Sequence, residues 1–426
     1  MSASGGRAGE EGAAAQGRAE GLGAGGFGEI ARRALAEGLF AGLVLRVERN
    51  GGLLFEEAWG EAAASGALGP GSAPVAMATS TVFDLASVSK LFTTTAVLRL
   101  VTMGELGLGE DVRGLLSRCS RSLGLAPALL SRLSADLGRV DVAALLSHSS
   151  GIHYWFPFYA ARAAADGAGR VAPDGAAAES AAARGAAPAG GAGFEEILAS
   201  VLEAHPPEGK VVYSDLNFML LGRLVEGATG LPLPEAVAAL VLKPLGLKRT
   251  SYAPRRGPGP LGPCAATEFG NRIERGMVAA LGLSFDAWRD ESRAIRGEAD
   301  DGNCHYFFGG AAGHAGVFSD ARDLCRLGRL YLEDGRIEGG AYLAPGLAAE
   351  ALRDRGGERG LGFQLGATYP GGGAGHTGFT GTCLYLHPAS GLSAAILANR
   401  LHAKEPRDLN PFRRELASAV LAAYGA

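Results

Sequence analysis

Strand-forming segments stand at both ends of the chain, with helix-forming segments between them. Residues 41–49 alternate like a strand, Asn50-Gly51 follows, and residues 53–59 form a partner strand. Asn-Gly between two such runs is the strongest short signal for a β-hairpin turn. Near the C-terminus, residues 381–387 and 392–399 flank a Pro-Ala-Ser-Gly turn and predict a second hairpin. The two hairpins together predict one antiparallel sheet built from both termini.

The middle of the chain has helical periodicity from about residue 87 to 247. We expect a helix that begins at Ser87, a short one at 142–146 capped by Gly151, and another at 218–225. Helices at about 27–37 and 411–424 flank the sheet segments. This order of strands and helices along the chain predicts an α+β fold, in which an antiparallel sheet with flanking helices holds an inserted, mostly helical domain. The sheet part spans about 27–86 and 300–424, and the helical part about 87–299.

Two segments lack the residues of a packed core. Residues 1–26 are rich in Gly, Ala and Glu and predict a disordered tail before a folded region at 27–424. Residues 161–193 are almost all Ala, Gly, Arg and Asp. We interpret them as a flexible surface insertion, although Ala-rich segments also form helices.

Composition narrows the classes of function. The net charge of −4 over 426 residues does not indicate a basic surface that binds nucleic acid. No apolar run reaches the roughly 18 residues of a membrane span, and no signal peptide is visible, so we expect a cytoplasmic protein. The five cysteines form no C-x-x-C pair and read as reduced, mostly buried thiols. The histidines lack metal-ligand spacing, so we expect neither metal nor cofactor. The expected partner is a small-molecule or peptide substrate, and no oligomeric state follows.

Most of the 40 basic residues of the chain are arginines, but position 90 is a lysine. A partly buried lysine can lose its proton, whereas arginine cannot. Ser87 lies one helical turn before it, and a serine hydroxyl is a weak nucleophile until an adjacent base takes its proton. Leu85, Leu91 and Phe92 are placed to shield the amine. A free N–H at the start of the Ser87 helix is half of an oxyanion hole.

Three further groups bear on the site, and the first two allow two interpretations each. Tyr213 comes before a helix and either faces a cleft or packs in the core, with Ser214 or Asp215 as helix N-cap. The stretch 375–381, which contains His376 and Thr377, either lets a substrate lie close to the strand or is a glycine-rich hairpin entry. The glycine-rich stretch 309–316 lacks the lysine of a phosphate-binding loop, so we expect close-packed backbone beside the cleft.

Three motifs in this order resemble those of the penicillin-recognising serine hydrolases, which include class C β-lactamases, D-alanyl-D-alanine carboxypeptidases and related esterases. The motifs are Ser87-Val88-Ser89-Lys90, Tyr213-Ser214-Asp215 and His376-Thr377-Gly378. The surrounding segments 83–87, 146–151, 243–247 and 313–316 match as well, and the resemblance covers about residues 30–424. It implies the β-lactamase/transpeptidase-like fold.

The resemblance also implies a mechanism. Ser87 would attack a carbonyl and form an acyl-enzyme, Lys90, neutral in part, would accept its proton, and Tyr213 would share the shuttle to the leaving group. The backbone N–H groups of Ser87 and Phe379 would hold the oxyanion. The substrate-binding set would comprise Asp215, His376, Thr377, Gly378 and Phe379, with His376 and Thr377 orienting a substrate carboxylate or the leaving group.

Two positions depart from the family pattern. Asp215 stands where the family usually has Asn, and we expect it to repel a substrate carboxylate and to stabilise a protonated Lys90. His376 stands where the family usually has Lys. If it binds an anion as imidazolium, the KM for anionic substrates should rise between about pH 6 and 8.

The sequence thus predicts a serine hydrolase that cleaves an amide or ester through a Ser87 acyl-enzyme. The substrate would be a D-amino-acid peptide or cell-wall fragment, a β-lactam-like compound or a small ester. The alternative is a non-catalytic binding or scaffold protein that keeps the fold. Asp215 and the 161–193 insertion favour this alternative, and the retained Ser87, Lys90 and Tyr213 oppose it.

Overall fold

The computed structural model describes residues 26–165, 193–252 and 262–426. Its largest sheet has six strands in the order β11-β12-β13-β1-β2-β3, and all neighbouring pairs are antiparallel. The strands are β1 (Gly42–Arg49), β2 (Gly52–Ala63), β3 (Val75–Ala76), β11 (Ala374–Thr377), β12 (Thr382–His387) and β13 (Leu392–Ala398). The N-terminal and C-terminal hairpins meet where β1 pairs with β13. The predicted α+β fold with a sheet built from both termini is confirmed.

Local turn chemistry explains the two hairpins. Asn50 and Gly51 both adopt positive φ, 49° and 79°, as a two-residue type I′ turn requires. The β12–β13 turn ends at Gly391, which also has positive φ. In the β1–β13 ladder Leu45 faces Ile396 and Val47 faces Ala394, so apolar positions of the two strands share a face.

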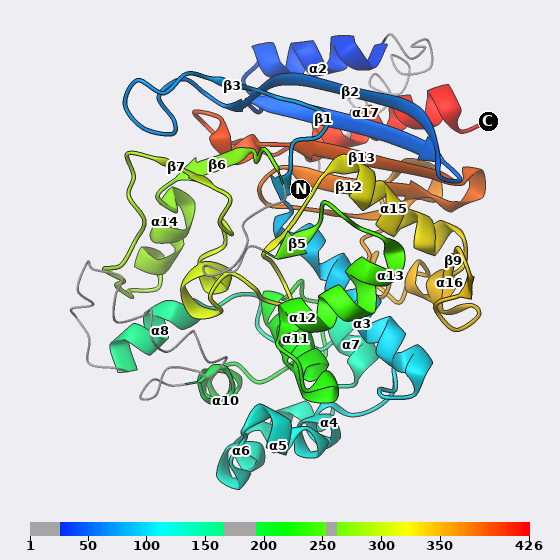
Figure 1. Ribbon diagram of the computed structural model, residues 1–426. Coiled ribbons are helices and arrows are strands. Elements are labelled where there is room, and N and C mark those ends of the chain that lie inside the picture. The colour runs from blue at the N-terminus through cyan, green and yellow to red at the C-terminus, as the bar shows by residue number, and fades with distance from the viewer. Residues whose placement is uncertain (1–25, 166–192, 253–261) are drawn as a thin grey trace, which may run out of the picture.

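Helices cover both faces of this sheet (Figure 1). On one face, α2 (Gly26–Ala36) and α17 (Asn410–Tyr424) pack on Leu43, Leu45 and Ile396. On the other, α15 (Ala321–Leu332) lies between the sheet and the helical region. The helical region places α3 (Lys90–Met103) and α11 (Asp215–Thr229) in one continuous apolar core with the inner face of the sheet.

The remaining elements are short. The helices are α4 (Val112–Arg118), α5 (Ser120–Leu123), α6 (Pro127–Leu137), α7 (Val142–Leu146), α8 (Phe158–Ala165), α10 (Phe194–Ala204), α12 (Leu233–Val237), α13 (Lys243–Leu245), α14 (Arg272–Ala280) and α16 (Leu347–Ala351). A small sheet joins β4 (Phe83–Asp84), β8 (Val317–Ser319) and β5 (Ser251–Tyr252), and two further pairs are β6 (Ala266–Phe269) with β7 (Ala294–Arg296) and β9 (Arg336–Ile337) with β10 (Gly340–Ala341).

Several expectations about segments need correction or lie outside the description. Residues 161–165 of the predicted insertion belong to helix α8, and 166–192 lie outside the described residues. The predicted tail also lies outside them, except Gly26, where α2 begins. Helix α7 ends at Leu146, and His148, with a φ of 57°, takes the left-handed conformation before Gly151 does. Helix α11 extends well beyond the predicted 218–225 at both ends.

Burial is as expected for the thiols, because all five cysteines are free and buried. Across the described ranges, no single helix is long and apolar enough to span a membrane. Helix α11 passes that test only together with Leu233–Leu245, from which it is bent by 77°. Most of α11 is buried in the core.

The glycine-rich stretch 309–316 is close-packed backbone, as predicted. A Cβ built on Gly313 would lie 2.0 Å from the carbonyl oxygen of Phe218, in α11. The Gly313 carbonyl accepts a hydrogen bond of 2.7 Å from the Thr93 hydroxyl of α3. The stretch therefore fixes the spacing of α3 and α11.

We expect Gly313→Ala to lower the free energy of unfolding by about 1–3 kcal/mol, because backbone must move to admit the methyl group. Chemical denaturation measures this change. Gly276→Ala in α14 is the control, since its Cβ would meet no atom within 4 Å and helix propensity favours alanine by up to about 1 kcal/mol. Equal stability of Gly313→Ala and the unaltered protein would contradict the packing argument.

Candidate active site

Ser87 lies in a tight turn between the small sheet and α3. The backbone N–H of Leu85 donates to Val317 in β8 (3.0 Å), and Ala86 has a φ of +44°. The Asp84 carboxylate accepts the Ala86 N–H at 2.8 Å. A left-handed residue cannot continue an α-helix. The chain therefore makes a 3₁₀ turn at Ala86–Ser89 and α3 begins at Lys90, three residues later than the helix predicted to begin at Ser87.

The Lys90 side chain is fully buried and points back at this turn. Its Nζ lies 3.0 Å from Ser87 Oγ, 3.3 Å from the carbonyl oxygen of His314 and 2.7 Å from Asp215 Oδ1. Burial is the largest single influence and lowers the pKa of Lys90, but the charge of Asp215, Tyr213 and hydrogen bonds to these two residues together raise the pKa above its ordinary value. Lys90 is therefore charged at neutral pH, whereas the sequence predicted a partly neutral amine. The expected stabilisation of protonated Lys90 by Asp215 is present.

Tyr213 comes just before α11 and contacts the amine from the side. Lys90 Nζ lies 5.0 Å from the centre of the Tyr213 ring. Ser214 is the N-cap of α11, where its hydroxyl accepts the N–H of Asn217 and donates to the carbonyl oxygen of His153 at 2.7 Å. Ser214 is therefore the N-cap, as one interpretation predicted, but Tyr213 is only partly buried and lies beside Lys90 rather than in the core.

Two buried histidines flank the Tyr213 ring, with ring centres 4.6 Å away for His148 and 6.1 Å for His376. Burial, aided by the charges of Lys90 and Arg359, lowers the pKa of each well below its ordinary value. His148 Nδ1 accepts the Ser214 N–H at 3.0 Å, and His376 Nδ1 lies 2.8 Å from the Thr377 carbonyl oxygen. Because a carbonyl only accepts, Nδ1 of His376 carries the proton and Nε2 keeps its lone pair. His376 is therefore neutral near pH 7, which corrects the imidazolium expectation.

The third motif is the end of β11 and the loop after it. The Thr377 hydroxyl donates to Gln364 Oε1 at 3.1 Å, and its backbone N–H donates to the same oxygen at 3.2 Å. A Cβ on Gly378 would lie 2.5 Å from the carbonyl oxygen of Leu85, so only glycine fits beside the Ser87 turn. The Phe379 side chain is about half exposed (47%), and the Arg400 guanidinium lies over its ring.

The loop after β11 is tied directly to the segment before Ser87. Thr380 Oγ1 donates to the Asp84 carbonyl at 2.7 Å, and Thr382 Oγ1 donates to the Leu85 carbonyl at 2.9 Å. Among the described residues, the backbone N–H groups of Ser87 and Phe379 donate to no other group. The structure thus brings Ser87, Lys90, Tyr213 and Asp215 together and holds the His376–Phe379 segment against them.

Sequence reasoning missed three residues beside the site. His148 belongs to a segment whose resemblance was noted, but it was considered only as a metal ligand. Gln364 lies in an isolated β-bridge with Gly375 of β11, and its amide oxygen also accepts the Tyr369 hydroxyl. The Arg359 guanidinium lies 5.2 Å from the centre of the Tyr213 ring. Neither Gln364 nor Arg359 stands in a motif, so no sequence signal marked them.

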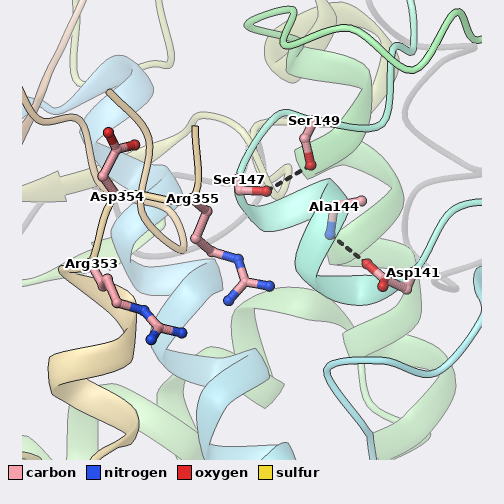
Figure 2. Close-up of a pocket in the computed structure, with 7 residues that line it drawn as sticks. All are labelled: Asp141, Ala144, Ser147, Ser149, Arg353, Asp354 and Arg355. Atoms are coloured by element: carbon pink, nitrogen blue, oxygen red, sulfur yellow. Dashed lines mark hydrogen bonds between the residues drawn. The ribbon is translucent and has the colours of Figure 1, made fainter. Parts of the chain in front are cut away.

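A polar pocket of about 490 Å³ lies apart from Ser87, between the end of α7 and the segment 353–355 (Figure 2). Ser147, Ser149, Arg353 and Arg355 line it, and both arginines pair with Glu350. It contains none of the residues that contact Lys90.

In the described ranges, no group of three or more His, Cys, Asp or Glu side chains is arranged to hold a metal ion.

Comparisons with known proteins identify relatives of this chain and solved structures with a similar fold. A relative from Bacillus subtilis, an N-acetylmuramyl-L-alanine amidase, is 28% identical over 387 residues, which are 88% of this chain and 80% of the relative. The solved structure of EstCE1, a hydrolase with promiscuous acyltransferase activity, has a TM-score of 0.62 at 21% identity and covers 94% of this chain and 97% of its own. A D-stereospecific amidohydrolase from Streptomyces sp. has a TM-score of 0.55 at 21% identity, covering 89% and 95%.

These relatives and solved structures are hydrolases, and the solved structures share the fold described above. The family model for beta-lactamase matches residues 27–418, which is nearly all of the described chain. The protein therefore belongs to the β-lactamase family of hydrolases.

Proposed function

We propose that this chain is a serine hydrolase that cleaves an amide or ester through an acyl-enzyme on Ser87. The observation that carries the proposal is the 3.0 Å contact between Ser87 Oγ and the fully buried Lys90 amine. A nucleophile within hydrogen-bond reach of a base that is itself held by a third group is the arrangement for covalent catalysis. Asp215 is the third group here.

Acylation begins when the Lys90 ammonium gives a proton to solvent water. The ammonium cannot accept the serine proton, so the neutral amine forms first. Ser87 Oγ then attacks the substrate carbonyl carbon as its proton moves to Lys90 Nζ. Tyr213, beside Lys90, donates its phenolic proton to the leaving nitrogen or oxygen as its bond to the carbonyl carbon breaks, and regains the proton that Lys90 Nζ accepted from Ser87. Water attacks the resulting ester and releases Ser87 with the same groups acting in reverse.

The oxyanion would be held by the backbone N–H groups of Ser87 and Phe379. Support comes from their lack of other partners among the described residues and from the hydrogen bonds of Thr380 and Thr382 to the segment before Ser87. Donors fixed in advance at the place where charge develops supply the largest electrostatic contribution to such reactions.

His376 and Thr377 would position the leaving group. With its Nδ1 proton held by the Thr377 carbonyl, neutral His376 keeps an Nε2 lone pair that is buried and without a partner among the described residues. It provides no positive charge for a carboxylate. Asp215, predicted as a substrate-binding residue, is paired with Lys90 and would act through that amine.

The first choice of substrate is a D-amino-acid peptide or cell-wall fragment, followed by a small ester, with β-lactam-like compounds as acylating agents. The names of an N-acetylmuramyl-L-alanine amidase and a D-stereospecific amidohydrolase among similar proteins support the first choice. EstCE1 supports ester cleavage.

Ser87→Ala should abolish labelling by a fluorescent fluorophosphonate and lower kcat by at least about 1000-fold, because the attacking oxygen is gone. Adduct mapping and ester-hydrolysis kinetics measure both. Ser89→Ala is the matched control, since Ser89 Oγ only accepts the Val317 N–H and touches no reacting group. Undiminished labelling of Ser87→Ala would contradict the proposal.

Asp215→Asn should shift the rising limb of kcat/KM to lower pH. The Asp215 charge raises the pKa of Lys90, so without it burial dominates and more of the amine is neutral at a given pH. Profiles from pH 6 to 10 with an uncharged ester test this. Lys90→Arg keeps the positive charge but cannot lose its proton and should be inactive. Glu208→Gln, at an exposed ion pair with Lys210, is the control. An unshifted Asp215→Asn limb would count against Lys90 as base.

The ratio of KM values for an anionic and a neutral ester should stay constant between about pH 6 and 8. Since burial lowers the pKa of His376 well below its ordinary value of 6.5, the imidazole does not change charge in this interval. Steady-state kinetics with the two esters measures the ratio. A ratio that rises across the interval, and becomes flat in His376→Gln, would restore the imidazolium role.

A further inference from the structure

His148 is hydrogen-bonded to the chain on both sides of Tyr213. It lies just after α7, where its φ of 57° places it in the left-handed region. Its backbone carbonyl accepts the N–H of Val212 at 2.9 Å, and its ring Nδ1 accepts the N–H of Ser214 at 3.0 Å. Val212 and Ser214 are the two neighbours of Tyr213 in the sequence. One residue therefore fixes the backbone immediately before and immediately after the tyrosine.

The other hydrogen bonds of this segment hold one side of Tyr213 only. The tyrosine lies in irregular backbone before the N-cap of α11, so the helix does not fix its position. The Ser214 hydroxyl donates to the carbonyl oxygen of His153. The N–H of Asp215 donates to the carbonyl oxygen of Tyr154 at 2.9 Å. Both bonds lie on the C-terminal side of Tyr213, whereas those of the preceding paragraph lie on both sides.

The His148 ring also contacts the side chain of Tyr213. The two ring centres are 4.6 Å apart and the ring planes are inclined by 39°. The ring of Phe218 in α11 lies 5.2 Å from that of His148. His148 is only 2% exposed, so its ring is enclosed at this place. The same residue thus holds the backbone of Tyr213 and packs against its ring.

These contacts require a neutral imidazole with its proton on Nε2. The Ser214 N–H occupies the Nδ1 lone pair, and a protonated Nδ1 could not accept it. Burial lowers the pKa of His148 well below its ordinary value, and the charges of Lys90 and Arg359 lower it further. Nε2 is buried and has no partner among the described residues. The hydrogen bonding of the ring is therefore directed at Ser214.

We propose that His148 is a positioning residue that keeps the Tyr213 phenol within reach of the Lys90 amine. This inference rests on the proposed function, in which Tyr213 gives a proton to the leaving group and regains one from Lys90. Proton transfer requires the two groups to lie within hydrogen-bond reach of each other. Lys90 is fixed by its burial in α3, whereas Tyr213 is not part of a helix or strand. His148 supplies the constraint on Tyr213 that a regular element does not.

Two substitutions separate the ring nitrogen from the backbone. Asparagine and glycine both adopt positive φ readily, but only asparagine carries an oxygen that can accept the Ser214 N–H in place of Nδ1. His148→Gly should lower kcat about 10- to 100-fold and leave KM within about twofold, because a displaced phenol impairs proton transfer rather than substrate binding. His148→Asn should keep kcat within about fivefold of the unaltered protein. Steady-state hydrolysis of an uncharged ester measures both.

Ser149→Ala is the control in the same segment, because Ser149 lines the pocket of Figure 2 and its hydroxyl pairs with Ser147. It should leave kcat and KM unchanged. Equal losses of kcat in His148→Asn and His148→Gly, or a loss that appears in KM instead, would contradict the positioning role.

Tyr213→Phe shows whether His148 acts through the phenol. Once the hydroxyl is absent, its position no longer matters. His148→Gly should therefore lower kcat by no more than about twofold in the Tyr213→Phe background, so that the two losses do not add. The same fold-loss in both backgrounds would mean that His148 acts elsewhere and would overturn the inference.

A spectroscopic measurement distinguishes failure of this inference from failure of the proposed function. If the unaltered protein neither hydrolyses the ester nor reacts with a fluorophosphonate, the serine-hydrolase proposal fails, and the tautomer of His148 then decides the positioning role. NMR of protein labelled with ¹⁵N-histidine should show a neutral ring with its proton on Nε2 between about pH 6 and 8, and His148→Asn should lack its signals. A His148 ring that carries its proton on Nδ1, or that gains charge in this interval, overturns the inference.

Discussion

The Lys90 amine is fully buried, and the site is organised around the groups that contact it. Desolvating an ammonium costs several kcal/mol unless other charges and dipoles take the place of water. Here a carboxylate from α11, a hydroxyl from the turn before α3 and a carbonyl from the 309–316 stretch do so. Three segments far apart in the sequence are thereby tied to one point. The arrangement that keeps the charge stable also aims a nitrogen at Ser87.

The same burial has opposite effects on neighbouring groups. It opposes charge on Lys90, His148 and His376 alike, yet only Lys90 stays charged, because only Lys90 has a carboxylate partner. The histidines instead use one ring nitrogen each in hydrogen bonds with the backbone. Charge at this site is therefore set by which side chain lies against the Asp215 carboxylate.

Much of the architecture followed from local chemistry. Asn50-Gly51 can form few turns other than the one observed, and the alternating segments on either side of it and near the C-terminus identified the sheet. The sequence motifs also brought together Ser87, Lys90 and Tyr213. What determines these features lies within a few residues or repeats with a regular period, so a single sequence reveals it.

The missed features depend on distant contacts. The 3₁₀ turn at Ala86–Ser89 follows from a left-handed Ala86 held by Asp84 and β8, which nothing in the local sequence marks. The neutrality of His376 follows from complete burial, and a motif does not report burial. Arg359 stands in a charged segment without periodicity, and its position was set by a β-bridge to Gln364. Each outcome belongs to the tertiary structure rather than to the segment itself.

The pairing of β1 with β13 has a consequence for synthesis on the ribosome. Strand β1 leaves the ribosome early, but its partner is made about 350 residues later, so one edge of the N-terminal hairpin lacks its neighbour during nearly the whole of translation. An unpaired edge of this kind invites association with other chains. Native closure of the sheet is thus a late, long-range event, and contacts between segments so far apart in the sequence form slowly.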